Sequence, residues 1–202
     1  MNGIDALSAL AGIVSPVALF APVLYAGAQR EHYSHLRQAI SDLGSVGAPD
    51  ATIVNVGIVC AGLFAAASSY AVRNAFGERG WSIVGMIALV LGGLALAGTA
   101  LSPWRGDPTD LSLLPNKLHL IAALIGFLGI SVAPIMFGLQ LRGILGTLSI
   151  GVGLVVLALA FWPLQADYRG LFQRAALGTF FFWLVLICAS KIGATAWQQG
   201  SN

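Results

Sequence analysis

The sequence predicts an all-α polytopic membrane protein, a bundle of six transmembrane helices. Only 9% of its residues are charged and 57% are hydrophobic, whereas soluble domains carry roughly 25% charged residues. The hydrophobic residues come in unbroken runs of about twenty, the length that a helix needs to cross the hydrocarbon core, and they do not alternate as in a barrel strand. Because lipid cannot satisfy exposed backbone groups, the spanning segments are expected to be helices.

The six apolar runs form a single domain, residues 1–202, because only short polar intervals separate them. The first run contains Pro16 and Pro22, which are tolerated where neighbouring helices re-satisfy the freed carbonyls. No lysine or arginine precedes it, so the run is interpreted as a retained helix and not as a cleavable signal. Lys191, near the end of the last run, is expected to snorkel to the interface. The predicted spans cover about residues 7–28, 52–73, 81–101, 118–139, 144–163 and 174–195.

The longest polar interval, residues 31–52, lies between the first two spans. Apolar side chains recur in it at helical spacing, at Tyr33, Leu36, Ile40 and Leu43. This pattern predicts a short interfacial helix whose apolar stripe faces the bundle or the acyl chains. Gly44 is expected to end that helix in the left-handed conformation. Asp50 or Thr52 is expected to cap the second span.

Ionisable residues gather on one side of the predicted bundle. Counting spans places the connections between spans 1 and 2, 3 and 4, and 5 and 6 on one side, which we name the polar face, and both termini on the other. The polar face holds all three histidines and six of the eight acidic residues. Ionisable groups beside a bilayer are costly, so they tend to pair with one another or to serve a site. Loop salt bridges and a ligand site are therefore the two interpretations of this face.

Two segments carry a resemblance to a known family. Ile40-Ser41-Asp42-Leu43-Gly44, followed by Gly47-Ala48-Pro49 and by Asn55, resembles the signature of the bacterial and archaeal six-span family catalogued as domain of unknown function 998. Trp104-Arg105-Gly106-Asp107, with His119 opening the fourth span, is similar to the second polar segment of that family. More distantly, the Ser-Asp-x-Gly segment resembles that of DRAM-like and GPI-lipid-remodelling membrane proteins. The resemblance implies a six-helix fold with cytoplasmic termini and no established catalytic activity.

The basic residues favour the opposite orientation. The polar face carries six of them against four on the other side, and the positive-inside rule places the more basic side in the cytoplasm. The difference is small, and acidic residues accompany the bases. We therefore favour the orientation that the resemblance implies, with cytoplasmic termini in a bacterial inner membrane.

The first functional hypothesis is the binding of a lipid or another hydrophobic ligand at the polar face. The forked guanidinium donors of Arg37, Arg105 and Arg169 suit a phosphate or a carboxylate. Acidic side chains and a histidine would orient them. The candidate ligand-binding residues are Arg37, Ser41, Asp42, Arg105, Asp107, His119, Asp167 and Arg169.

Two alternatives come from other classes of protein. One is a non-catalytic accessory or scaffold subunit of a larger membrane complex, whose partner subunits dock on apolar faces such as the run from Phe180 to Trp183. The other is a metal-dependent membrane hydrolase, since His32, His35 and His119 with a nearby aspartate supply zinc-ligand atoms. The spacing matches no metal-binding motif, so no resident metal and no catalytic residue is predicted.

No cofactor is predicted, because a haem held by two histidines needs them deep within facing spans, and here they lie at or outside span ends. The net charge of +2 is too small and too dispersed to indicate nucleic acid. The expected partners are membrane lipids and other membrane-protein subunits.

Overall fold

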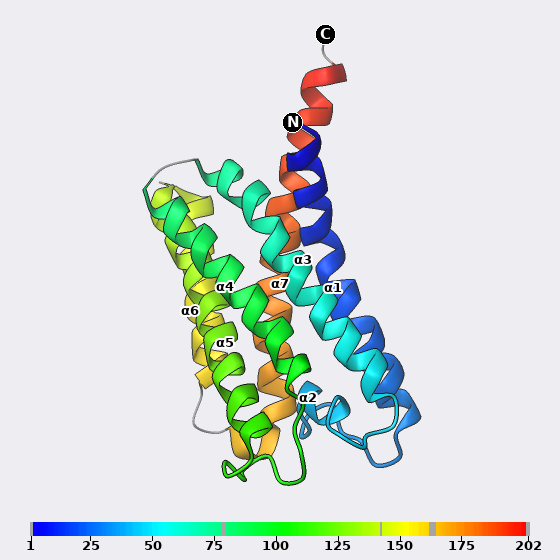
Figure 1. Ribbon diagram of the computed structural model, residues 1–202. Coiled ribbons are helices and arrows are strands. Elements are labelled where there is room, and N and C mark those ends of the chain that lie inside the picture. The colour runs from blue at the N-terminus through cyan, green and yellow to red at the C-terminus, as the bar shows by residue number, and fades with distance from the viewer. Residues whose placement is uncertain (1, 78–79, 142, 162–164, 201–202) are drawn as a thin grey trace.

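The computed structural model describes residues 2–77, 80–141, 143–161 and 165–200, and the elements in this part of the chain are helices (Figure 1). The last helix has non-helical backbone angles at Tyr168, where φ is −128° and ψ is 32°. The helices are α1 (Gly3–Gln29), α2 (Ile40–Leu43), α3 (Ala51–Phe76), α4 (Trp81–Leu101), α5 (Leu114–Gln140), α6 (Ile144–Phe161) and α7 (Gln165–Gly200).

Six of the helices are long and apolar enough to cross a membrane, namely α1, α3, α4, α5, α6 and the Asp167–Gly193 part of α7. Both termini lie at one end of the bundle, and the connections that follow α1 and α4 lie at the other end (Figure 1). The number and order of the predicted spans are therefore confirmed, and the expected end of the fifth, at residue 163, lies outside the described residues. The fourth begins earlier than expected, at Leu114 instead of residue 118, because Pro115 supplies a helical start that needs no N–H donor.

The spanning helices form a closed ring in the order α1, α3, α4, α5, α6, α7, and α3 also contacts α7 across it. Glycines permit the closest approaches. A Cβ atom on Gly62 of α3 would collide with the backbone of Gly93 on α4, and one on Gly92 would collide with Gly129 of α5. Glycines of α4 therefore allow it to pack closely against both α3 and α5.

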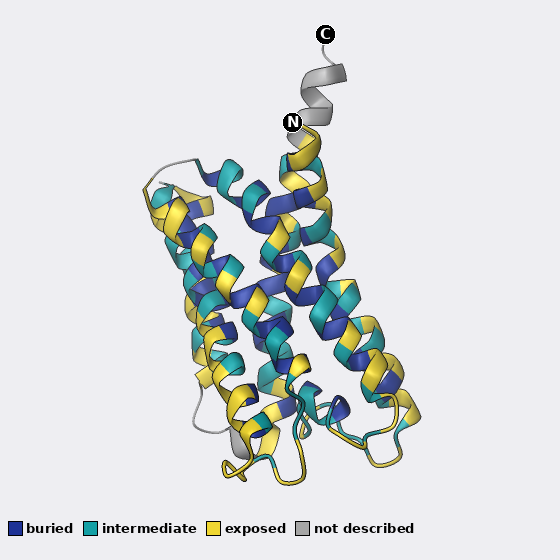
Figure 2. Cartoon of the chain, viewed as in Figure 1, coloured by how far each residue is buried: buried dark blue, intermediate teal, exposed yellow. Residues whose placement is uncertain are grey.

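Most of the aromatic run on α7 faces the core. Phe180, Phe181 and Trp183 are buried, whereas Phe182 is 67% exposed. Successive residues point about 100° apart on a helix, so four in a row cannot share one outer face. The expectation that this run docks a partner subunit is therefore wrong for three of its four members. Figure 2 shows exposed residues along the outside of the bundle and buried ones between the helices.

Lys191 bonds to neighbouring helices at the end of the bundle that carries the termini. Its ammonium donates to the carbonyl of Asn74 at 3.1 Å and lies 3.8 Å from the buried carboxylate of Asp5. The side chain thus links α1, α3 and α7.

The interfacial helix is shorter than predicted, since only Ile40–Leu43 is helical and the residues before it form turns. Ile40 and Leu43 are buried in the bundle, 2% and 0% exposed. Gly44 has a φ of −93° and is not left-handed. A Cβ atom there would collide with the side chain of Asn55, which donates to the Gly44 carbonyl at 2.8 Å. Asp50 occupies the N-cap position of α3, but its side chain makes no capping hydrogen bond.

Candidate functional site

The chain segment before α2 is fixed to α7 by Arg174. Its guanidinium donates to the carbonyls of His35 at 2.8 Å, Gln38 at 2.9 Å and Gly170 at 3.0 Å, and also to the Tyr33 hydroxyl. Burial raises the pKa of Tyr33, although the charge of Arg174 acts in the opposite direction. One side chain of the last span therefore holds the first connection against the end of the bundle.

Further contacts dock α2 itself. The Ile40 N–H donates to Oε1 of Gln173 at 2.6 Å. Asp42 accepts from the Ala39 N–H at 2.8 Å, which caps α2, and also pairs with Arg169 at 2.9 Å. These contacts turn Ser41 toward the interior of the bundle.

The second polar segment packs against α2 through Trp104. Its indole N–H donates to the Ser41 hydroxyl at 3.1 Å, and its ring lies 4.1 Å from the ring centroid of His119. Asn116, which is 0% exposed, organises the rest of the segment. Its amide bonds to the N–H and C=O of Arg105 and to the carbonyls of Asp107 and Asp110.

The side chains of Asp107 and Asp110 close local turns at the surface. Asp107 accepts from the N–H and hydroxyl of Thr109, and these bonds hold the pKa of its carboxyl below the usual value. Asp110 accepts in the same way from Ser112, with the same effect on its pKa. Both carboxylates therefore stabilise surface turns through hydrogen bonds within the loop.

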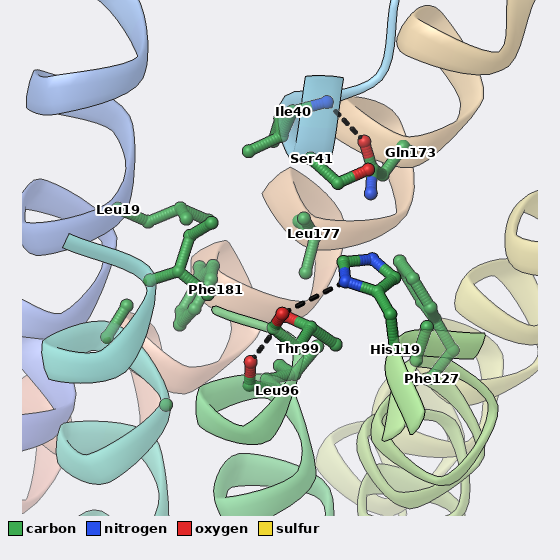
Figure 3. Close-up of a pocket in the computed structure, with 14 residues that line it drawn as sticks. Leu19, Ile40, Ser41, Leu96, Thr99, His119, Phe127, Gln173, Leu177 and Phe181 are labelled. Carbon is green, nitrogen blue, oxygen red and sulfur yellow. Dashed lines mark hydrogen bonds between the residues drawn. The ribbon is translucent and has the colours of Figure 1, made fainter. Parts of the chain in front are cut away.

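His119 lies in the second turn of α5 and is 5% exposed. Its Nδ1 is 2.9 Å from the carbonyl oxygen of Thr99 and 3.0 Å from that of Ser102. Carbonyl oxygens only accept hydrogen bonds, so Nδ1 carries the proton and the neutral ring leaves Nε2 as an acceptor. In Figure 3 this second nitrogen points away from Thr99, toward Ser41 and Gln173.

A cavity lies beneath α2, between the helices. The void totals about 480 Å³ with its open mouth, and about 40 Å³ is open to the centre of a water molecule. Three polar side chains line the end under α2, namely Ser41, His119 and Gln173. A fourth, Thr99, already donates its hydroxyl to the Leu96 carbonyl at 2.7 Å. The apolar wall includes Leu19, Ile58, Leu96, Phe127, Leu177 and Phe181.

A second hollow adjoins this cavity and shares Phe127 and Gln173 with it. It measures about 380 Å³ with its opening and is also lined by Arg169. Arg169 thus lies beside the cavity, and its guanidinium is already paired with Asp42.

The structure gathers only some of the predicted ligand residues. Ser41 and His119 line the cavity, and Asp42 and Arg169 form their ion pair beside it. The remaining four are exposed and do not line the cavity: Arg37, Arg105, Asp107 and Asp167. Arg37, Arg105 and Arg169 therefore do not converge on this cavity.

Sequence reasoning missed Gln173 and the role of Trp104. The signal for Gln173 was its place as an uncharged polar residue at the start of an apolar run. Nothing in the sequence shows that Trp104 donates to Ser41, because the two are 63 residues apart.

The three histidines do not come together. Among the described residues, no group of three histidine, cysteine or acidic side chains can hold a metal ion. His32 is exposed, and His35 packs edge-on against Tyr33 at 5.0 Å between ring centroids. Burial, and then the charge of Arg174, lower the pKa of His35.

Six apolar helices around an amphipathic cavity, closed by a short helix, define an integral membrane protein of the helical-bundle class. The chain belongs to the family described as protein of unknown function (DUF998), whose sequence model matches residues 13–190. That match contains both polar segments and confirms the resemblance noted from them. No curated protein and no solved structure matches the chain. The more distant resemblance to DRAM-like and GPI-lipid-remodelling proteins is not shown by these comparisons.

Proposed function

We propose that this protein binds a membrane amphiphile, with the polar head beside Ser41, His119 and Gln173 and the apolar chain along the deeper cavity wall. The observation that carries the proposal is that the cavity is polar at one end only. Ligand sites are typically apolar clefts with a few convergent polar groups. Each of these three side chains makes a hydrogen bond within the protein and keeps a further polar atom for the cavity.

The position of the polar end supports the same ligand class. Ser41 and Gln173 lie where the connections close the bundle, whereas Leu19, Ile58 and Phe181 lie farther along their helices. An amphiphile in the cavity would thus have its head at the membrane surface and its chain in the hydrocarbon layer, as in the bilayer itself. On binding, its head would stay in polar surroundings and its chain in apolar surroundings.

The size of the cavity limits how much of the ligand is enclosed. A water needs about 10–15 Å³ of such volume, so 40 Å³ accommodates roughly three water-sized groups. The enclosed part therefore fits a small head and the first methylene groups. The rest of the chain would extend beyond the enclosed volume.

Native mass spectrometry of the protein in mild detergent tests this function. Ala123 lines the cavity, and Ala123→Phe would fill it. Ala158 is exposed on α6, so Ala158→Phe is the matched control on the outer surface. We expect copurified lipid on the wild type and on Ala158→Phe, and its loss from Ala123→Phe. Equal lipid on all three proteins would place it on the outer surface and contradict the proposal.

The orientation belongs to the same proposal: a bacterial inner membrane, with cytoplasmic termini and the polar face outside. It is supported by the family resemblance and opposed by the six-to-four distribution of basic residues. Fusion of a reporter that works only in the periplasm to the C-terminus tests it. No reporter activity is expected, and clear activity would reverse the orientation.

A further inference from the structure

The polar end of the cavity also determines which hydrogen-bonding groups a ligand must have. Each of its three polar side chains already makes one hydrogen bond within the protein. That bond determines which donor or acceptor remains for a ligand. The partner in each of these bonds is a backbone carbonyl, a backbone N–H or an indole N–H, and each such group has a single role in a hydrogen bond.

His119 contributes an acceptor. Its Nδ1–H is directed at the carbonyls of Thr99 and Ser102 at 2.9 and 3.0 Å. Nε2 has no hydrogen-bond partner in the part of the chain that the structure describes, and it faces the cavity (Figure 3). The neutral ring is thus held in one tautomer, with the Nε2 lone pair toward the cavity.

Gln173 contributes a donor. Its amide oxygen accepts from the Ile40 backbone N–H at 2.6 Å. A backbone N–H only donates, so this atom is the oxygen, and the amide NH₂ is the group left for the cavity. Figure 3 shows that nitrogen on the side of Ser41 and His119.

Ser41 contributes a second donor. Its oxygen accepts from the Trp104 indole N–H at 3.1 Å. An indole N–H only donates, so the hydrogen of the Ser41 hydroxyl is not used in this bond. Within the described residues the Ser41 hydroxyl donates to no other group, which leaves its hydrogen for the cavity.

Two donors and one acceptor around one space match a hydroxyl group. A hydroxyl oxygen accepts two hydrogen bonds and donates one. An ether or ester oxygen only accepts and would leave Nε2 of His119 buried without a partner, which is costly. A carboxylate has the same defect and also brings a negative charge to a neutral lining, while Arg169 in the adjoining hollow is already paired with Asp42 at 2.9 Å.

We propose that the cavity selects an uncharged long-chain alcohol, whose hydroxyl donates to Nε2 of His119 and accepts from Ser41 and Gln173. This inference rests on the proposed function and adds the chemical class of the head. His119 is then the residue that distinguishes an alcohol from an ether of the same chain length, because only the alcohol can donate to Nε2.

Competition binding to the full-length protein in mild detergent tests this selectivity. The probe is a photoactivatable hexadecanol with a diazirine in its chain, and the competitors are hexadecanol, hexadecyl methyl ether and palmitate at neutral pH. We expect hexadecanol to compete at least about ten-fold better than the other two, because each of them leaves a buried acceptor unpaired. Equal competition by the ether, or better competition by palmitate, would overturn the hydroxyl assignment.

Two variants locate the selectivity. His119→Phe keeps an aromatic ring but removes the acceptor, so we expect hexadecanol to fall to the level of the ether while the ether is unchanged. Ser41→Ala removes one donor, keeps α2 docked through Gln173, and is expected to weaken both ligands by a similar factor. An unchanged preference for the alcohol in a folded His119→Phe protein would contradict the role of His119.

The same series separates this inference from the function on which it rests. Failure of the probe and all three competitors to bind, together with equal lipid on the cavity-filled variant, would remove the binding function altogether. Binding without discrimination between alcohol and ether would remove only the hydroxyl assignment.

Discussion

The indole N–H of Trp104 donates a 3.1 Å hydrogen bond to the hydroxyl of Ser41, and through it the connection after α4 is joined to α2. The same indole stacks on His119, with 4.1 Å between ring centroids. One side chain thus positions two of the three polar groups in the cavity.

Trp104→Phe is expected to keep the stacking and lose the hydrogen bond, which lowers the free energy of unfolding by about 1 kcal/mol. Trp104→Ala removes the ring contact as well and should cost about 1 kcal/mol more. Thermal unfolding in detergent measures both. Trp81→Phe is the control, since Trp81 is exposed on α4, and an equal loss there would contradict the specific role of Trp104.

Arg174→Lys is expected to release the segment that precedes α2. A lysine cannot reproduce forked donation to three backbone carbonyls and the Tyr33 hydroxyl. Hydrogen exchange of residues 30–39 should speed up, and the free energy of unfolding should fall by about 2–3 kcal/mol. Arg169→Lys, at an exposed ion pair with Asp42, should change stability by less than about 1 kcal/mol. Similar exchange in both variants would contradict the prediction.

The first connection should loosen as the pH falls through the range of His35. Burial and the charge of Arg174 hold the pKa of folded His35 below its ordinary value of 6.5. The unfolded chain therefore binds the proton first, so stability is full above pH 6.5 and is lost as the pH falls toward the folded pKa. Hydrogen exchange of residues 30–39 between neutral and mildly acidic pH measures this loss. His35→Phe should remove the pH dependence in this range, and its persistence would assign it to another group.

Asn116→Asp is expected to destabilise the second polar segment strongly. The Asn116 amide NH₂ donates to the carbonyls of Arg105, Asp107 and Asp110. A carboxylate would face these three oxygens with no hydrogen, in a fully buried position. We expect a loss of about 3 kcal/mol or more in the free energy of unfolding, measured by thermal unfolding. Asp110→Asn, at the exposed surface, is the control and should have little effect.

Gly62→Ala tests the close approach of α3 and α4. A Cβ atom there would collide with the backbone of Gly93 and Ala97, so the helices must separate and stability should fall by about 1–3 kcal/mol. Gly151→Ala on α6 is the matched control, because nothing lies within 4 Å of its Cβ position. That change should be neutral or stabilising by up to about 1 kcal/mol. Equal losses would show that helix contact is not the cause.

The sequence by itself determined the number of spans and their order, and it placed the connections after the first and third spans at the same end of the bundle. Run length and hydrophobicity are local properties, and the bilayer converts them directly into spanning helices. The polar segments around Ser41 and Trp104 also identified the family correctly, because the residues that carry the resemblance are contiguous.

The tertiary structure decided which polar residues share a space. Ser41, His119 and Gln173 come from α2, α5 and α7, and their convergence depends on how far each helix is rotated and where it crosses its neighbours. Those rotations are set by packing, such as the contact between Gly62 and Gly93, and no local pattern records them. For the same reason Arg37 and Arg105, which looked equivalent to Arg169 in sequence, are exposed and do not line the cavity.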